Sequence, residues 1–266
     1  MRGEKEQRCF DSIKKFLEKD IYFAMSCEDE DIIKTAFKEA VPNPELNDFP
    51  DFIYSNGFIE HFQVTSSKEN RKGSTMMREE NDIARDFQNR AKVALEDNNV
   101  DEVSIKFIET PIYSHKSHSY IYFIDSFKRN FSNHMDSLNE YDGPKENKIF
   151  LIEYTDATLR MSKRYPEDLM MGVSYGDLFV RENPAYRLSR DIEMLRYIYD
   201  QRNLVDYVMF VNDDSFCGII VEVIKTQNAL EIIKLLHEGY DCHCAMLGSS
   251  QVGTVVSVPN KEGDNI

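Results

Sequence analysis

Short apolar runs alternate with amphipathic helical segments along most of this 266-residue chain. Four of the runs are Phe58–Val64, Lys148–Tyr154, Val205–Val211 and Gly218–Ile224. Their nearly continuous apolar character is typical of strands covered on both faces, whereas the segments between them repeat apolar residues at helical spacing. Because such strands need helices on both faces, the pattern predicts an α/β (α+β) protein with a central mixed β-sheet flanked by helices.

The same periodicities give the expected order of elements. Helices are expected over residues 4–19, 31–40, 74–95, 119–138, 189–201 and 228–238, and strands over 21–25, 51–55, 58–64, 102–108, 148–154, 205–211, 218–224 and 242–247. Residues 157–184 are expected to be irregular because Pro and Gly interrupt them. No linker rich in Gly, Ser or Pro divides the chain. We therefore expect one domain over residues 1–258 and a frayed tail over 259–266.

Charge and cysteine content narrow the class of protein. The chain has 32 Lys and Arg against 47 Asp and Glu, a formal net charge of −15, which argues against a broad nucleic-acid-coating surface. Its 12% aromatic content argues against disorder. The apolar runs are shorter than the ~18 residues that a membrane helix needs, and no signal peptide is evident. Five scattered cysteines are typical of a reduced protein, so we expect a cytoplasmic protein without membrane contact.

Two acids near an Asn56-Gly57 dipeptide form the main candidate site. If this dipeptide makes a two-residue hairpin turn, Ile53 pairs with Glu60, and Asp51 and Glu60 lie on one face as diagonal neighbours. Paired carboxylates can bind Mg²⁺ or Mn²⁺, which activates water for attack on a phosphate. The alternative is that both acids simply face solvent. His61 and Gln63 lie on the opposite face, either as a polar pair packed against a helix or as the site itself.

Two basic segments could contact phosphate. The first contains Lys68, Arg71, Lys72 and Arg78 just before the expected helix 74–95, and the second contains Arg160, Lys163 and Arg164 with Tyr154 and Tyr165 nearby. A helix N-terminus beside basic side chains can hold a phosphate group, and interleaved aromatic and basic residues can contact base and phosphate together. The alternative for both segments is a solvated loop.

The arrangement around Pro50-Asp51 and Glu60 resembles the PD-(D/E)XK nuclease superfamily, which places Pro-Asp on one strand and acid-x-Lys on the next, with helices on either side. The resemblance covers roughly residues 4–110 and implies a restriction-endonuclease-like core, with 111–258 as an extension. It implies metal ligation by Asp51 and Glu60. Phe62 stands where the motif has Lys, so the resemblance implies that Gln63 or Lys68 supplies the missing group.

Two other clusters are weaker candidate sites. Asp213, Glu222 and Lys225 repeat a similar spacing, but Asp213 is expected in a turn, and Glu222 and Lys225 are expected on opposite faces of their strand. Cys242 and Cys244 share one face of an expected strand, where buried thiols in a core are the simpler interpretation than zinc ligands.

Two functions follow from these features. The first is a Mg²⁺- or Mn²⁺-dependent phosphodiesterase that acts on nucleic acid, with Asp51, Glu60, Gln63 and Lys68 as catalytic residues and Arg71, Lys72 and Arg78 as phosphate-binding residues. The second is a non-catalytic interaction protein on a nuclease-like or other α/β scaffold, whose acidic surface binds a basic protein. The sequence does not define the nucleic acid or the oligomeric state.

Overall fold

The computed structural model describes residues 4–45, 49–67, 85–86, 89–90, 92–93, 104–113, 118–156, 158–163, 185–214, 218–236, 240–244 and 248–257. Where one domain was expected, the chain divides into two compact units. The first unit contains Met1–Ser67 and Ser119–Cys244, and the second contains Lys68–His118 and Ala245–Ile266. The strand-and-helix alternation of the sequence is concentrated in the first unit.

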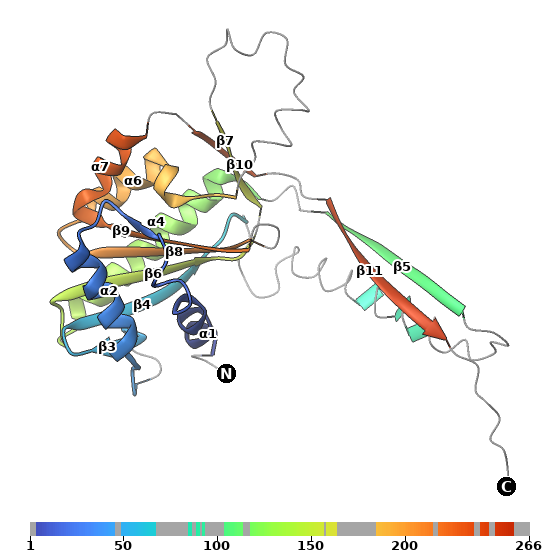
Figure 1. Ribbon diagram of the computed structural model, residues 1–266, viewed down its shortest axis with the longest axis horizontal. Helices are drawn as coiled ribbons and strands as arrows, with labels where there is room; N and C mark the ends of the chain where they lie inside the picture. The colour runs from blue at the N-terminus through green and yellow to red at the C-terminus, as the bar shows by residue number, and fades with distance from the viewer. Residues whose placement is uncertain are drawn as a thin grey trace, which may run out of the picture. The chain divides into compact units, whose positions relative to one another are not determined.

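A seven-stranded mixed sheet forms the centre of the first unit, in the order β1-β9-β8-β6-β4-β3-β2 (Figure 1). Its strands are β1 (Tyr22–Phe23), β2 (Val41–Pro42), β3 (Phe52–Tyr54), β4 (Gly57–Val64), β6 (Asn147–Tyr154), β8 (Tyr207–Asp214) and β9 (Gly218–Lys225). Strands β4, β6 and β8 run parallel, and the β3–β4 and β8–β9 pairs are antiparallel. The expected α/β fold with a central mixed sheet is therefore confirmed.

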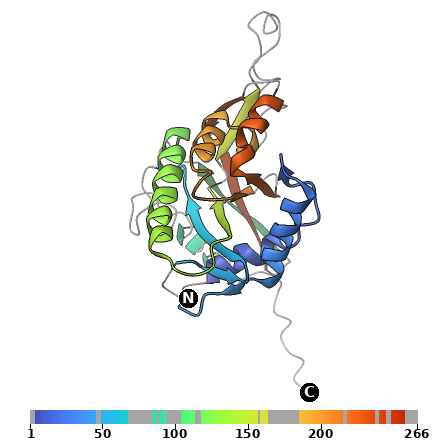
Figure 2. The same cartoon turned by 90° about the vertical axis from the view of Figure 1, so that its left-hand side faces the viewer.

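Helices cover both faces of this sheet, as Figure 2 shows. They are α1 (Glu4–Ile13), α2 (Cys27–Glu39), α4 (Tyr120–Glu140), α6 (Ile192–Asp200) and α7 (Ala229–Leu235), with 3-10 turns η2 (Leu188–Arg190) and η3 (Thr226–Asn228). Helices α1 and α2 pack in one core cluster, and α4, α6 and α7 pack in the other. Each face of the central strands is therefore buried, which explains their continuous apolar runs.

The helix boundaries follow local capping more than apolar periodicity. Helix α2 begins at Cys27, four residues before the expected start, because Ser26 and Asp29 form a reciprocal capping box. Ser119 caps α4 by accepting a hydrogen bond from the N–H of Tyr122. Helix α1 ends at Ile13 instead of residue 19, and turns follow it.

The β3–β4 hairpin has a different register from the expected one. Tyr54 pairs with Gly57 and Ile53 with Phe58, so Ser55 and Asn56 form the turn. Gly57 is instead the first residue of β4. This position requires glycine because a Cβ there would overlap the backbone carbonyl oxygen of Asn147 on β6. The shift of two residues keeps the alternation of side chains, and extending the register by one residue sets Asp51 opposite Glu60.

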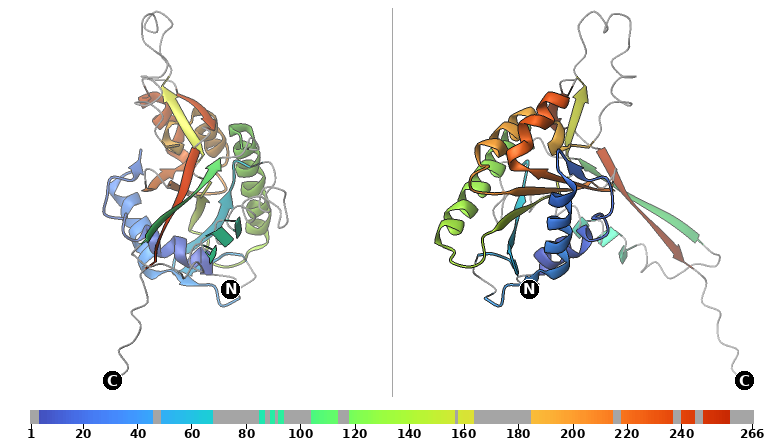
Figure 3. Two further views of the ribbon diagram at one scale, coloured as in Figure 1. Left: turned by 90° about the vertical axis from the view of Figure 1, so that its right-hand side faces the viewer. Right: turned by 60° about the vertical axis from the view of Figure 1, so that its left-hand side comes forward.

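Two smaller sheets lie outside the main one. Strand β7 (Leu159–Lys163) pairs antiparallel with β10 (Tyr240–Cys244) in the first unit, and β5 (Ser104–Tyr113) pairs antiparallel with β11 (Gly248–Ser257) in the second (Figure 3). The strand expected at 242–247 is thus part of a separate ribbon, and β11 was not predicted. Of the helix expected at 74–95, only residues 85–86, 89–90 and 92–93 are described, and they are helical.

Across the described ranges, no helix combines the length and apolar character required to cross a membrane.

Candidate functional site

Two hydrogen bonds link Asp51 to Glu60 and to its neighbour His61 on β4. The N–H of Asp51 donates to Glu60 Oε2 at 3.0 Å, and the N–H of His61 donates to Asp51 Oδ2 at 2.9 Å. Strand β3 begins only at Phe52, so the backbone of β4 beyond Ile59 has no β3 partner, and the Asp51 carboxylate takes the place of a strand acceptor. The short length of β3 therefore brings the two acids together.

Burial makes this acidic pair electrostatically unusual. Glu60 is only 5% exposed, and Asp51 is half-buried, so the interpretation of two solvent-facing carboxylates is wrong for Glu60. Burial, together with the negative charge of Glu60, raises the pKa of Asp51 to about 7, although the hydrogen bond from His61 opposes the shift. Such perturbed acids gather at functional sites more often than elsewhere.

Helix α4 supplies a further contact to Glu60. Nδ1 of His134 lies 2.6 Å from Glu60 Oε1, and the His134 ring stacks on Phe62 with 4.5 Å between ring centroids. Phe62, where the nuclease motif has Lys, is 5% exposed and belongs to the core on the α4 side. The Asp51 N–H therefore holds one oxygen of Glu60 and His134 holds the other, which fixes the orientation of the Glu60 carboxylate.

The opposite face of β4 carries a second polar cluster. Nε2 of His61 lies 3.2 Å from Glu153 Oε2, and Gln63 Nε2 donates to the same oxygen at 2.6 Å. Burial tends to raise the pKa of Glu153, but these two hydrogen bonds outweigh burial and hold that pKa below its usual range. The expected placement of His61 and Gln63 on one face is confirmed, and Gln63 is committed to Glu153 on this face.

Cys9 of α1 completes that second cluster. One ligating atom each from Cys9, His61 and Glu153 lies within 4.8 Å of the other two. Cys9 is 3% exposed, and burial with the nearby Glu153 carboxylate raises the pKa of its thiol. Helix α1, β4 and β6 therefore bring together three side chains that are distant in sequence.

The basic residues predicted to bind phosphate divide into two groups. Lys68, Arg71, Lys72 and Arg78 lie outside the described residues, as does Arg164. Arg160 lies on β7 and is only 4% exposed, with NH1 donating to the carbonyl of Leu159. Its interpretation as part of a solvated loop is therefore wrong, because β7 is covered on the side of Arg160.

The Asp213, Glu222 and Lys225 candidate does not converge on one point. Asp213 lies on β8 and not in a turn. Glu222 is fully buried and accepts a hydrogen bond from Ser189 Oγ at 2.6 Å, whereas Lys225 pairs with Asp29 at 2.6 Å. The expected separation of Glu222 and Lys225 onto opposite faces is confirmed.

Cys242 and Cys244 are free thiols that pack, partly buried, against the core on the α4 side. The Sγ of Cys242 donates to Asp191 Oδ2 at 3.9 Å, and Thr158 Oγ1 donates to Cys244 Sγ at 3.8 Å. The two thiols thus have separate partners, as packing residues would.

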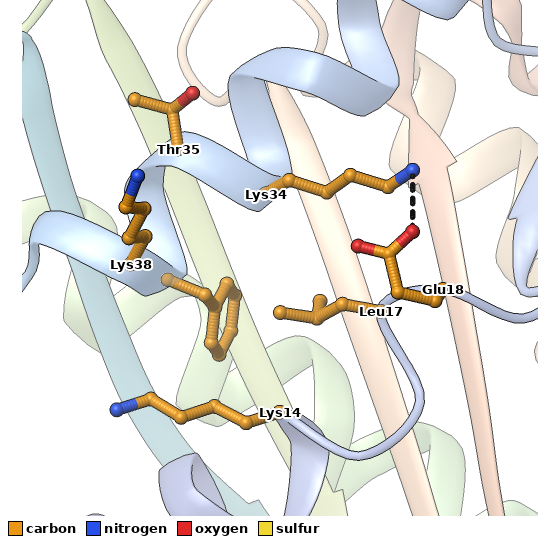
Figure 4. A pocket seen from close by; sticks show the side chains of 7 residues that line it. Lys14, Leu17, Glu18, Lys34, Thr35 and Lys38 are labelled. Carbon is orange, nitrogen blue, oxygen red and sulfur yellow. Dashed lines mark ion pairs between the residues drawn. The ribbon is translucent and has the colours of Figure 1, made fainter.

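A hollow of about 470 Å³ lies between the end of α1 and α2 (Figure 4). Lys14, Lys34 and Lys38 surround it, with Leu17 and Phe37 as its apolar lining. Lys34 pairs with Glu18 at 3.3 Å, which leaves the hollow net positive in an acidic protein. An anionic group would find favourable charge there.

This chain matches no protein-family model, no curated protein and no solved structure.

Sequence reasoning missed His134, Glu153 and Cys9 as members of these clusters. Their only signal in the sequence was residue type, since each lies on a different element from its partners. Placing His134 beside Glu60 needs the packing of α4 on β4, which no local pattern reports.

Proposed function

We propose that this protein is a metal-dependent phosphodiesterase that hydrolyses nucleic acid, with Asp51 and Glu60 as ligands of a Mg²⁺ or Mn²⁺ ion. The observation that carries the proposal is the pair of a half-buried Asp51 and a buried Glu60, in which the N–H of Asp51 donates to Glu60 Oε2 at 3.0 Å. Two like charges in a partly buried position are unfavourable unless a positive charge offsets them. A divalent cation would supply that charge.

The donor atoms of the pair suit a hard cation. Carboxylate oxygens are the ligands that Mg²⁺ and Mn²⁺ prefer, and each oxygen can accept more than one contact. Within the described part of the chain, Asp51 Oδ1 has no hydrogen-bond donor, so that oxygen remains available to a ligand. A cation bound here would polarise a phosphoryl oxygen and lower the pKa of water.

The protein's own residues hold this arrangement in place. The His61 N–H fixes the Asp51 carboxylate, and the Asp51 N–H and His134 fix the two oxygens of Glu60. Because ligand orientation is set by such partners, His134 acts as a positioning residue for Glu60. Gln63 donates to Glu153, so its amide has a role on the other face of β4 and does not take the place of the motif Lys.

The topology around the pair also supports the proposal. Asp51 directly precedes β3, Glu60 lies on the next strand β4, and the helices α1 and α2 come before both in the chain. Two acids on successive strands after a helix are what the resemblance to PD-(D/E)XK nucleases implies. The lysine-lined hollow lies between α1 and α2, which pack on the face of the sheet opposite α4, so it is a separate anion contact and not part of this pair.

The alternative of a non-catalytic protein with a basic partner is less well supported at this site. A docking surface presents its charges to solvent, whereas Glu60 is 5% exposed and lies between Asp51 and α4. A basic side chain of a partner could not pair with Glu60 without moving α4 or β3.

Calorimetric titration of Mn²⁺ into the full chain, with a cleavage assay on plasmid DNA and on single-stranded RNA, tests the proposal. We expect one Mn²⁺ per chain and Mn²⁺-dependent cleavage, both reduced at least 10-fold in Asp51→Asn and in Glu60→Gln. Asp125→Asn, an exposed acid on α4, is the matched control and should behave as the wild type. Absence of both binding and cleavage in the folded wild type would overturn the proposal.

A further inference from the structure

Cys9, His61 and Glu153 combine the three side-chain types that bind zinc most often. We propose that these residues form a second metal site, on the α1 side of the sheet, for a borderline-soft divalent cation of the zinc class. The proposal does not depend on the phosphodiesterase function, because it uses different donor atoms on the opposite face of β4.

The spacing of the three donors fits a metal centre. A tetrahedral zinc site with bonds of about 2.0–2.3 Å separates its ligand atoms by roughly 3.3–3.8 Å. The ligating atoms of Cys9, His61 and Glu153 all lie within 4.8 Å of one another, and His61 Nε2 is 3.2 Å from Glu153 Oε2. Small side-chain rotations that move each donor atom by a few tenths of an ångström would therefore bring the three atoms to the separations of a zinc site.

The chemistry of the donors selects the metal. A thiolate and an imidazole are poor ligands for Mg²⁺ but good ones for Zn²⁺, and carboxylate oxygen is accepted by both. Three protein ligands leave a fourth coordination position, as in catalytic zinc sites. The cluster thus differs from the all-oxygen pair of Asp51 and Glu60 in the cation it would bind.

Charge balance also favours a cation here. Cys9 is 3% and His61 6% exposed, so any net charge left in this region is poorly solvated. On binding, the Cys9 thiol releases its proton to solvent, and the thiolate, neutral His61 and the Glu153 carboxylate together offset both charges of the metal ion. The filled site would be neutral and therefore suited to a buried position.

The surroundings hold the donors as a metal site requires. Gln63 Nε2 donates to Glu153 Oε2 at 2.6 Å and limits the rotation of that carboxylate. Phe10, next to Cys9, is stacked between Phe37 and Phe52 at centroid distances of 4.8 and 4.4 Å, which anchors α1 against the sheet. Glu153 is the next-to-last residue of the parallel strand β6, near the edge of the sheet where α/β proteins commonly bind ligands.

Cobalt titration tests the proposal, because Co²⁺ in a tetrahedral site with a thiolate ligand has absorption bands in the visible and near-ultraviolet ranges. The 266-residue chain, freed of metal with a chelator, should bind one Co²⁺ with a thiolate-to-cobalt charge-transfer band, and Zn²⁺ should abolish that band. Cys9→Ser should remove the charge-transfer band, and His61→Gln and Glu153→Gln should weaken cobalt binding at least 10-fold. Cys27→Ser, at an exposed cysteine, should leave the spectrum unchanged.

X-ray absorption of the zinc-loaded wild type keeps the test independent of how the variants fold. It should show one sulfur ligand at about 2.3 Å together with nitrogen or oxygen ligands at about 2.0–2.2 Å. A wild type without a charge-transfer band, a band that persists in Cys9→Ser, or a zinc shell without sulfur would each overturn the proposal. The phosphodiesterase proposal would be unaffected, since its readout is Mn²⁺ binding in Asp51 and Glu60 variants.

Discussion

Asp51 and Glu60 are linked by two hydrogen bonds, one from the N–H of Asp51 to Glu60 Oε2 at 3.0 Å and one from the N–H of His61, the neighbour of Glu60, to Asp51 Oδ2 at 2.9 Å. A change in either carboxylate therefore disturbs the position of its partner. The two side chains behave as a unit, which has a measurable consequence for metal binding.

A double-mutant cycle should reveal this coupling. We expect Asp51→Asn and Glu60→Gln each to lower Mn²⁺ affinity at least 10-fold, and the double variant to lower it little further, because residues in one network are not additive. Calorimetry on the three variants and the wild type measures the coupling. If the free-energy losses of Mn²⁺ binding in the two single variants add up to the loss in the double variant, the two acids act independently.

His134 should matter to the metal through Glu60 alone. Because its Nδ1 lies 2.6 Å from Glu60 Oε1, His134→Ala should weaken Mn²⁺ binding by about 10–100-fold, the range for partners that orient a metal ligand. His134→Asn, which keeps a polar group at a similar position, should recover part of the affinity. Asp136→Asn, an exposed change on the same helix, serves as the control. Equal affinities for wild type and His134→Ala would contradict the positioning role.

The lysine-lined hollow should contribute to binding of nucleic acid if the proposed function holds. Replacing Lys38 or Lys14 with Ala should lower affinity similarly for all sequences, and each should reduce the slope of log K against log salt concentration by about 1. Fluorescence anisotropy with a labelled oligonucleotide across a salt series measures that slope. Lys234→Ala, on α7 and away from the hollow, is the control, and an equal loss there would indicate nonspecific charge effects.

Stability should depend on pH through Asp29, which joins α2 to the sheet. Its carboxylate accepts hydrogen bonds from Lys225 Nζ at 2.6 Å, Tyr207 OH at 2.8 Å and Ser26 Oγ at 2.8 Å. Burial tends to raise the pKa of Asp29, but these hydrogen bonds outweigh it and lower that pKa to about 2. The stability gained from the low pKa is therefore present above about pH 4 and lost as the pH falls toward 2.

Asp29→Asn removes this contribution. Urea unfolding at pH 7 should show a loss of about 2 kcal/mol, and the difference from wild type should shrink below pH 4 as Asp29 becomes protonated. Asp11→Asn, an exposed acid on α1, should show no comparable change. A difference between Asp29→Asn and wild type that stays constant down to pH 2 would contradict the assigned ionic role.

Gly57 should tolerate no side chain. A Cβ at this position would overlap the backbone carbonyl oxygen of Asn147, and backbone cannot move aside as a side chain can. Gly57→Ala should therefore destabilise the protein by about 1–3 kcal/mol, the usual range for overpacking. Thermal unfolding of Gly57→Ala measures the loss of stability, and Ser55→Ala, at an exposed turn residue, is the variant for comparison. A neutral Gly57→Ala would show that β4 and β6 can separate locally.

Much of the fold was predictable because strand and helix periodicities are local. The runs at 58–64, 148–154 and 218–224 all became strands of the main sheet within one residue of their expected ends. The hairpin register was missed because Asn56-Gly57 is a strong turn signal, while the close approach of Asn147, distant in sequence, decided where Gly57 was needed. Strand β11 was missed because its partner β5 lies more than a hundred residues earlier.

The candidate site, like the fold, could be predicted from the sequence only in part. Residue order and alternation alone determined that Asp51 and Glu60 lie on one face of a hairpin, that His61 and Gln63 share the other, and that an α/β sheet carries them. Tertiary packing alone decided that Glu60 is buried beside His134 and that Cys9 meets His61 and Glu153. Alternation along a strand is set by covalent geometry, whereas burial and ligand clusters arise only when helices far away in the chain pack against that strand.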